Sequence, residues 1–326
     1  MNDLSIVVEM DNAALLDWQE IAETVGALEK QVCEWKSSNR QSVELVVVQA
    51  GSDEDNIKLE QQFKSHFPDL SSVADTKFFA VAGGRYYDLK NEGIKHASGD
   101  IIILIDSDTK AQPGWLQRLI EPFSNSEIQV VNGVTYLKYD SFLSRVFALY
   151  WIFPLKKNDM RKSEKRALNA NNSAFRQKWI KENPFPECSG FKVACGLLWN
   201  KVLKDNVPYM RVEAFVEHLP PLGIKFFIWR ALIAGRDQDM RYTFFKTGNK
   251  FKRTEHAFSR FFTRFFETIR RTISLYQEVG FSVWQAPIAL LIWTIFSIVF
   301  FVGQLAHVFW PSIYKDQSVP DFVKVS

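Results

Sequence analysis

The stretch that decides the fold of this chain is Ile101-Ile-Ile-Leu-Ile105, followed directly by Asp106-Ser-Asp108-Thr109. Five consecutive β-branched or leucyl residues are typical of a strand buried on both faces, and Ala97-Ser-Gly-Asp100 forms the turn before it. Asp106 and Asp108 leave the strand end at positions i and i+2. At this spacing both carboxylates can bind one hard divalent cation, which in turn neutralises a diphosphate.

Strands and helices are expected to alternate on either side of this stretch. Residues spaced by three and four predict an amphipathic helix between the first two strands, namely Leu15, Ile21, Val25, Leu28, Val32 and Trp35. Shorter helices are expected near 54–63 and 88–96, with a strand near 77–81. This alternation predicts an α/β fold, a mostly parallel sheet with helices on both faces. Ligands then bind beyond the carboxyl ends of the strands.

A combined pattern runs through Ser5-Ile-Val-Val-Glu9, Val43-Glu-Leu-Val-Val-Val48, Tyr86-Tyr-Asp-Leu-Lys-Asn91-Glu-Gly93, Asp106-Ser-Asp108, Pro113-Gly-Trp-Leu116 and Asn132-Gly-Val-Thr-Tyr136. Together these segments resemble family 2 glycosyltransferases of the Rossmann-like GT-A fold, over about the first 220 residues. The resemblance implies transfer of a sugar from a nucleotide diphosphate donor with a divalent metal, Mn²⁺ or Mg²⁺. It places Asp108 most directly on the metal and Asp106 near the ribose or the metal shell.

The resemblance also implies further contacts to the donor. Lys90 resembles the basic residue of the family that stands before Asn91 and approaches the diphosphate, and Arg230 is a further candidate for that contact. Gln49 stands where the family usually has an acidic residue that receives the base. Its amide can still bind a base edge, and the alternative is that Asp53 substitutes for the acidic residue. Glu9, after the first strand, is a candidate for nucleotide contact, with helix capping or a solvated position as the alternative.

Glu187 is the predicted catalytic base. It lies in Asn183-Pro-Phe-Pro-Glu-Cys-Ser-Gly190, where the family supplies that base, normally from an acidic pair. An inverting transfer needs a carboxylate that takes the proton of the acceptor hydroxyl, and a surface loop glutamate is the alternative interpretation. His218 matches a position where many GT-A enzymes return a histidine to the metal, and a strand-end histidine satisfied by backbone is the alternative.

The carboxyl-terminal part is strongly apolar. The chain of 326 residues is 47% hydrophobic and 14% aromatic, which is rich for a purely soluble protein, and residues 281–314 contain no Asp, Glu, Lys or Arg. Ala286 to Val308 is long enough to cross a bilayer as a helix, and Trp284 and Trp310 stand at its edges. We therefore expect one membrane span, with a buried core helix or a re-entrant hairpin as the alternatives.

A basic amphipathic helix is predicted just before that segment. Its apolar residues recur at three and four, namely Phe258, Phe261, Phe262, Phe265, Phe266, Ile269 and Ile273, while Arg260, Arg264, Arg270 and Arg271 take other positions. Such a helix lies at an anionic membrane surface with its phenylalanines down, unless it packs on the domain instead. The excess of basic residues before the span predicts a cytoplasmic catalytic domain at a bacterial inner membrane.

The remaining composition narrows the class of protein. The net charge of +3 reflects the basic patch, and no patterned basic and aromatic surface suggests nucleic acid. The amino terminus resembles no secretory signal, and the odd number of cysteines, Cys33, Cys188 and Cys195, favours a reducing compartment. We expect a catalytic domain at 1–247, an interfacial segment at 248–280, and a transmembrane anchor with a short tail at 281–326.

These observations predict a metal-dependent inverting glycosyltransferase with a lipid-linked or membrane-proximal acceptor, in envelope polysaccharide or glycolipid synthesis. A nucleotidyltransferase is one alternative, but it needs a basic phosphate-binding loop early in the chain, and Glu9-Met-Asp-Asn12 is acidic. A catalytically silent GT-A-like membrane scaffold is the other. Ala50 and the missing acidic partner of Glu187 motivate that alternative.

Overall fold

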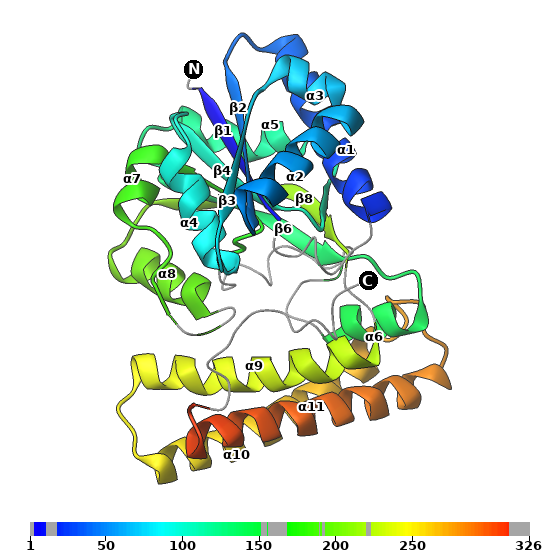
Figure 1. Cartoon of the computed structure of the whole chain (residues 1–326). Coiled ribbons are helices and arrows are strands. Elements are labelled where there is room, and N and C mark those ends of the chain that lie inside the picture. The colour runs from blue at the N-terminus through cyan, green and yellow to red at the C-terminus, as the bar shows by residue number, and fades with distance from the viewer. Residues whose placement is uncertain are drawn as a thin grey trace.

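Figure 1 shows the computed structural model of the chain, which describes residues 3–10, 18–150, 155, 168–188, 190, 193–219 and 223–312. In this part of the chain one eight-stranded sheet forms the upper body, in the strand order β3-β2-β1-β4-β7-β6-β8-β5. The strands are β1 (Leu4–Glu9), β2 (Val43–Ala50), β3 (Asp75–Val81), β4 (Ile101–Asp106), β5 (Thr109–Ala111), β6 (Val130–Leu137), β7 (Asn172–Arg176) and β8 (Tyr209–His218).

The sheet is mixed, with a parallel half and a half that contains antiparallel strands. Strands β3, β2, β1 and β4 run parallel, whereas β7 pairs antiparallel with both β4 and β6. Strand β8 then pairs parallel with β6 and antiparallel with the short β5. The predicted α/β fold is confirmed, and the parallel half brings the carboxyl ends of β1, β2 and β4 to one edge.

Helices cover both faces of the sheet, as predicted. One core contains Ile101, Ile103 and Ile105 with α1 (Trp18–Ser38), α2 (Asp53–His66), α3 (Pro68–Val73) and α5 (Trp115–Ile120). The other contains Ile102 and Leu104 with α4 (Tyr86–His96), α7 (Gln177–Glu182) and α8 (Val193–Lys204). Because side chains alternate along a strand, burial on both faces explains the unbroken apolar run.

The expected helices and strand around this core are present. The helix between the first two strands is α1, although Leu15 lies outside the described residues. Helix α2 begins at a capping box, in which the Ser52 hydroxyl accepts a hydrogen bond from the Asp55 amide and the Asp55 carboxylate accepts one from the Ser52 amide. The strand near 77–81 is β3 and the helix near 88–96 is α4.

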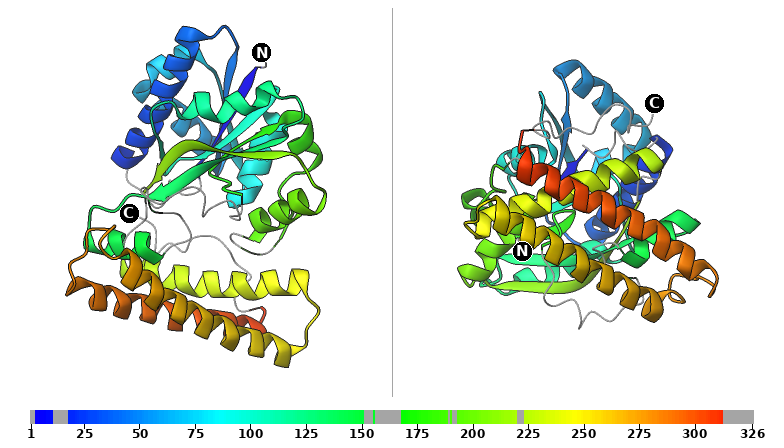
Figure 2. Two further views of the ribbon diagram at one scale, coloured as in Figure 1. Left: turned by 180° about the vertical axis from the view of Figure 1, so that it is seen from behind. Right: turned by 90° about the horizontal axis from the view of Figure 1, so that it is seen from below.

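A layer of long helices lies beneath the sheet (Figures 1 and 2). It consists of α9 (Ile224–Phe245), α10 (Lys250–Leu275) and α11 (Gln285–Phe309), with the shorter α6 (Phe142–Tyr150) at one end. These helices share a third core, separate from the two that flank the sheet, which includes Phe147, Phe227, Trp293 and Phe296. The predicted amphipathic helix is α10, and α9, which precedes it, packs along α11.

Helix α11 confirms the predicted apolar helix. Within the described residues it alone is long and apolar enough to cross a membrane, with a mean hydropathy of 2.3 over its most apolar window. That result concerns length and composition, so the crossing itself stays a prediction. The predicted domain boundaries at 247 and 280 also stay predictions.

Candidate active site

Glu9 and Asp106 lie side by side at the carboxyl edge of the parallel strands. They end β1 and β4, and the two residues are register partners in the sheet. Residues paired in this way project to the same face of a sheet, here the face that α4 covers. Both side chains are buried, with 0% and 3% of the residue exposed. Two carboxylates are thus enclosed beneath one helix.

Lys90 of α4 is the counter-ion for both carboxylates. Its side chain is fully buried, and Nζ lies 2.5 Å from Oδ1 of Asp106 and 3.9 Å from Oε2 of Glu9. Tyr86, one turn earlier, donates a hydrogen bond of 2.8 Å from its hydroxyl to Oδ2 of Asp106. Burial and the neighbouring Asp106 hold the pKa of the Tyr86 hydroxyl well above its ordinary value, so it stays a donor.

Close packing of α4 on β1 allows Lys90 to reach Asp106 and Glu9. A Cβ atom at Gly93, one turn after Lys90, would lie 2.3 Å from Cγ1 of Val7, so glycine permits the helix to rest directly on the strand. Tyr86 and Lys90 are four residues apart and therefore share one face of the helix. Sequence reasoning named Lys90 but missed Tyr86, which this spacing could have indicated.

Asp108 and His218 meet in the second half of the site. Strand β5 pairs antiparallel with β8 so that Thr109 lies opposite His218, and the amide of Leu219 donates a hydrogen bond of 2.8 Å to the carbonyl of Asp108. Nε2 of His218 lies 3.5 Å from Oδ2 of Asp108. The Asp108 side chain is 1% exposed and that of His218 17%. Strand pairing alone brings these distant residues together.

A carboxylate and an imidazole suit Mn²⁺ or Mg²⁺ when phosphates and water complete the coordination. The described residues contain no group of three or more His, Cys, Asp or Glu side chains arranged to hold a metal ion. A cation at Asp108 and His218 would therefore depend on phosphate oxygens of a ligand. Asp106 is held by Lys90 and Tyr86, and its role at the metal stays a prediction.

Gln49 lies near the same edge, at the end of β2. Its Nε2 atom is buried and has no hydrogen-bond partner among the described residues. An unsatisfied buried donor is costly unless a ligand accepts from it. This geometry fits recognition of an acceptor atom on a base, and the predicted base contact remains untested.

Glu187 lies at a pocket between the start of α4 and residues 186–188, which Arg85, Tyr86, Asn91, Glu187 and Cys188 help to line. Tyr86 connects this pocket to the carboxylate cluster, because the residue lines the pocket and its hydroxyl donates a hydrogen bond to Asp106. Glu187 itself is exposed. The predicted base therefore lies at this pocket with its side chain exposed, and its role stays a prediction.

Asn91 holds the loop that carries Glu187. Its Nδ2 donates a hydrogen bond of 2.9 Å to the carbonyl of Phe185, and the amide of Phe185 donates one of 3.0 Å to its Oδ1. The predicted donor contact of Asn91 is untested, and the structure gives the side chain a positioning contact instead.

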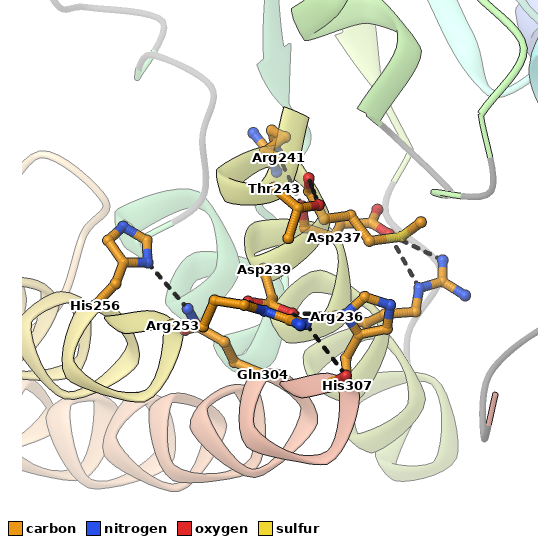
Figure 3. Close-up of polar contacts among 10 residues, drawn as sticks. Arg236, Asp237, Asp239, Arg241, Thr243, Arg253, His256, Gln304 and His307 are labelled. Atoms are coloured by element: carbon orange, nitrogen blue, oxygen red, sulfur yellow. Dashed lines mark hydrogen bonds and ion pairs between the residues drawn. The ribbon is translucent and has the colours of Figure 1, made fainter. Parts of the chain in front are cut away.

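Arg230 lies on α9, in the helix layer, and its electrostatic neighbours include Asp237, Arg241 and Tyr87. Burial lowers its pKa to about 10, with Asp237 opposing the shift and Arg241 adding to it. Asp237 accepts a hydrogen bond of 2.9 Å from the neighbouring Arg236, as Figure 3 shows. Sequence reasoning named Arg230 but missed its neighbours Arg236 and Asp237, each 1% exposed.

Similarity to solved structures supports the fold. The mannosyltransferase PcManGT from Pyrobaculum calidifontis, solved with GDP-Man and Mn²⁺, has a TM-score of 0.57 at 13% identity, covering 95% of this chain and 88% of that one. Mannosyl-3-phosphoglycerate synthase from Rubrobacter xylanophilus has a TM-score of 0.48 at 14% identity, covering 74% of each chain. Glucosyl-3-phosphoglycerate synthase from Mycobacterium tuberculosis, with Mn²⁺, UDP and phosphoglyceric acid, has 0.45 at 16%, covering 74% and 78%.

The first of these similarities confirms the GT-A fold and, at this identity, the fold alone. No curated protein matches the sequence significantly. A family model described as glycosyl transferase family 2 matches residues 5–183, which is more than half of the chain and runs from β1 to the end of α7. The chain belongs to glycosyl transferase family 2.

Proposed function

We propose that this protein is an inverting glycosyltransferase that moves a sugar from a nucleotide diphosphate sugar to a lipid-linked or membrane-proximal acceptor, with a divalent cation, Mn²⁺ or Mg²⁺. The observation that carries the proposal is the meeting of Asp108 and His218 beside the cluster of Lys90, Asp106 and Glu9. This is the edge at which sheets of parallel strands bind ligands. Family membership supplies the reaction class.

In the proposed reaction, an acceptor oxygen attacks the anomeric carbon from the side opposite the diphosphate. The new glycosidic bond forms as the bond to the diphosphate oxygen breaks, and the configuration inverts. Glu187 takes the proton of the acceptor hydroxyl, in keeping with its exposed position at the pocket. Asp108 and His218 would hold the cation, which when bound neutralises charge on the leaving diphosphate.

The helix layer supports the membrane part of the proposal. Helix α10 carries seven Lys or Arg residues against two Glu, and a surface of this sign attracts anionic lipid. We place the catalytic domain on the cytoplasmic side of a bacterial inner membrane, where such an enzyme acts in envelope polysaccharide or glycolipid synthesis. A pocket next to the helix layer suits an acceptor whose hydrophobic tail stays in the bilayer.

Calorimetry with a panel of nucleoside diphosphates, with and without Mn²⁺, tests the donor site. We expect one base to bind in a Mn²⁺-dependent manner and Asp108→Ala to abolish that binding. His218→Ala is expected to weaken it less, because water replaces an imidazole ligand more readily than a charge. Asp75→Ala removes an exposed carboxylate at the start of β3, at the opposite edge, and is the matched control. Unchanged Mn²⁺-dependent affinity in Asp108→Ala would overturn the assignment.

The acceptor requires its own assay. Once the donor is identified, the enzyme is incubated with that radiolabelled nucleotide sugar and a bacterial lipid extract, and label is counted in the organic phase. Transfer into lipid supports the proposed acceptor class. Donor binding without transfer to any extract, and without hydrolysis, would favour the silent scaffold.

A further inference from the structure

Helix α11 presents one face to protein along its length. Its buried residues recur at helical spacing and include Ala289, Trp293, Phe296, Phe300 and His307. The ring of Trp293 stacks on Phe296 with centroids 4.3 Å apart and on Tyr150 of α6 at 5.1 Å. This face of α11 is therefore part of a protein core and is not available to lipid.

Helices α9 and α11 cross with their backbones in contact. A Cβ atom at Gly235 of α9 would lie 1.9 Å from the carbonyl oxygen of Phe300, and one at Gly303 of α11 would lie 2.2 Å from the carbonyl oxygen of Leu232. Only glycine permits this approach. The fit is specific to this arrangement, since rotation of either helix would place a larger residue at the crossing.

A buried ion group joins the three helices at one end of the layer (Figure 3). Asp239 of α9 is 0% exposed, and its carboxylate accepts hydrogen bonds from Arg253 of α10 and from Nδ1 of His307 of α11, the latter at 2.7 Å. Burial alone would raise the pKa of Asp239, but the hydrogen bonds from His307 and Arg253 outweigh it and lower the pKa. Removal of α11 would leave this carboxylate without one of its partners.

The opposite face of α11 and one flank of α10 are exposed and apolar. On α11 this stripe consists of Ile288, Leu291, Ile295, Ile298 and Val302. On α10 it consists of Phe251, Phe258, Phe262, Phe266 and Ile273. Phe258 packs against Phe301 of α11 with centroids 4.9 Å apart, which joins the two stripes. We call the two stripes together the lower apolar face.

The lower apolar face points away from the catalytic domain. The buried side of α11 rests on α9 and α6, and the views from the side and from below place α10 and α11 farthest from the sheet (Figures 1 and 2). The stripe of α11 lies on the other side of that helix. A flat apolar surface of two adjacent helices is larger than a soluble monomer usually exposes.

We propose that α10 and α11 lie flat in the interface of one leaflet, with the lower apolar face in the lipid, and that α11 does not cross the bilayer. A crossing α11 would draw α10, packed along it, into the hydrocarbon with the exposed basic side chains of Lys250, Lys252 and Arg270, each at a high cost. Flat placement leaves the exposed Lys250, Lys252 and Arg270 at the anionic headgroups. Trp284 and Trp310, exposed at the two ends of α11, then lie at the same interface.

Protease accessibility decides between the two topologies. The full chain, with a site for a specific protease before Met1 and another after Ser326, is produced in bacteria, and inverted inner-membrane vesicles are prepared. Cleavage at the amino-terminal site measures the fraction of the protein whose catalytic domain faces the outside of the vesicles. Flat placement leaves both sites on that side, so we expect the carboxyl-terminal site to be cut to the same extent without detergent. Protection of that site until detergent is added would overturn the proposal.

A matched pair of substitutions tests which face meets the lipid. Phe262→Glu places a charge in the lower apolar face, whereas Thr263→Glu adds the same charge at the next, exposed position on another flank of α10. With vesicles of phosphatidylcholine and phosphatidylglycerol, we expect Phe262→Glu to weaken binding about tenfold or more and Thr263→Glu to weaken it about twofold, by charge alone. Equal effects would overturn the proposal. A full-length protein that does not bind the vesicles and buries this face in a dimer would also overturn it.

Discussion

The carboxamide of Asn91 on α4 and the backbone of Phe185 form two hydrogen bonds, one in each direction, of 2.9 and 3.0 Å. Phe185 is two residues before Glu187, so helix α4 sets the position of the loop that carries the predicted base. Helix α4, which carries Lys90, and the loop that carries Glu187 are thereby linked through one side chain.

Asn91→Ala is expected to lower kcat about tenfold while affinity for the donor stays within about twofold. The loop is freed because two hydrogen bonds of about 1 kcal/mol each are lost. A rise of about 1.4 kcal/mol in the activation free energy, caused by a misplaced base, lowers the rate tenfold. Steady-state kinetics with calorimetry measure the two effects. Asn56→Ala is the matched control, because it also removes an asparagine that donates to a backbone carbonyl, that of Phe78, far from this loop. An equal loss of kcat in both variants would show a general effect on stability.

Glu187→Gln is expected to reduce single-turnover transfer by about a hundredfold to ten-thousandfold, the contribution usual for a general base. The amide keeps the shape of the side chain but not its basicity, so donor affinity is expected to remain unchanged. Glu182→Gln, an exposed carboxylate at the end of α7, is the control. A wild-type transfer rate in Glu187→Gln would show that another group takes the proton of the acceptor hydroxyl. Glu213 and Glu217 of β8 would be tested next.

Lys90→Met is expected to destabilise the fold by about 3–5 kcal/mol, because it leaves Asp106 and Glu9 buried without their counter-ion. Adding Asp106→Asn to this variant is expected to restore part of the lost free energy of unfolding, because it removes one of the two buried negative charges. Lys95→Met on the same helix breaks an exposed ion pair with Glu92 and is expected to cost less than about 1 kcal/mol. Urea unfolding measures all three, and equal costs for Lys90 and Lys95 would contradict the burial of Lys90.

The ionisation of Glu44 is expected to make the free energy of unfolding depend on pH. Burial tends to raise its pKa, but hydrogen bonds from Lys77, Ser5 and Ser98 outweigh burial and lower it. A carboxylate with a lowered pKa contributes stability above its unfolded pKa, and this contribution is lost as the pH falls through the folded value. We therefore expect Glu44→Gln to cost about 1–3 kcal/mol at pH 7 and the two unfolding free energies to converge below about pH 4. A constant difference across that range would contradict the assignment.

Alanine at the crossing of α9 and α11 is expected to disrupt the helix layer. Gly235→Ala or Gly303→Ala forces the two backbones apart, and overpacking of this kind costs about 1–3 kcal/mol or more. Gly26→Ala on α1 is the control, because no atom lies within 4 Å of the added Cβ. That change is expected to stabilise the protein by about 0.5–1 kcal/mol, as in other helix interiors. Thermal unfolding in mild detergent compares them, and similar midpoints would rule out the close crossing.

Local sequence pattern was sufficient for most elements from β1 to β4, for α10 and α11, and for half of the candidate site. The apolar run at 101–105 determined a strand buried on both faces, and Asp106 and Asp108 had to follow at its end. The spacing of phenylalanines determined α10, and the length and composition of the last apolar segment determined α11. These features depend on periodicity and propensity, which neighbouring residues set among themselves.

Only the tertiary structure decided which of these residues meet. Pairing of β5 with β8 brings His218 close to Asp108. Close packing of α4 on β1 buries Lys90 against Asp106. Which face of α11 stays exposed follows from its contacts with α9 and α10, which its own apolar residues do not specify. Such contacts join segments far apart in the chain, and their geometry depends on the shape of both partners at once.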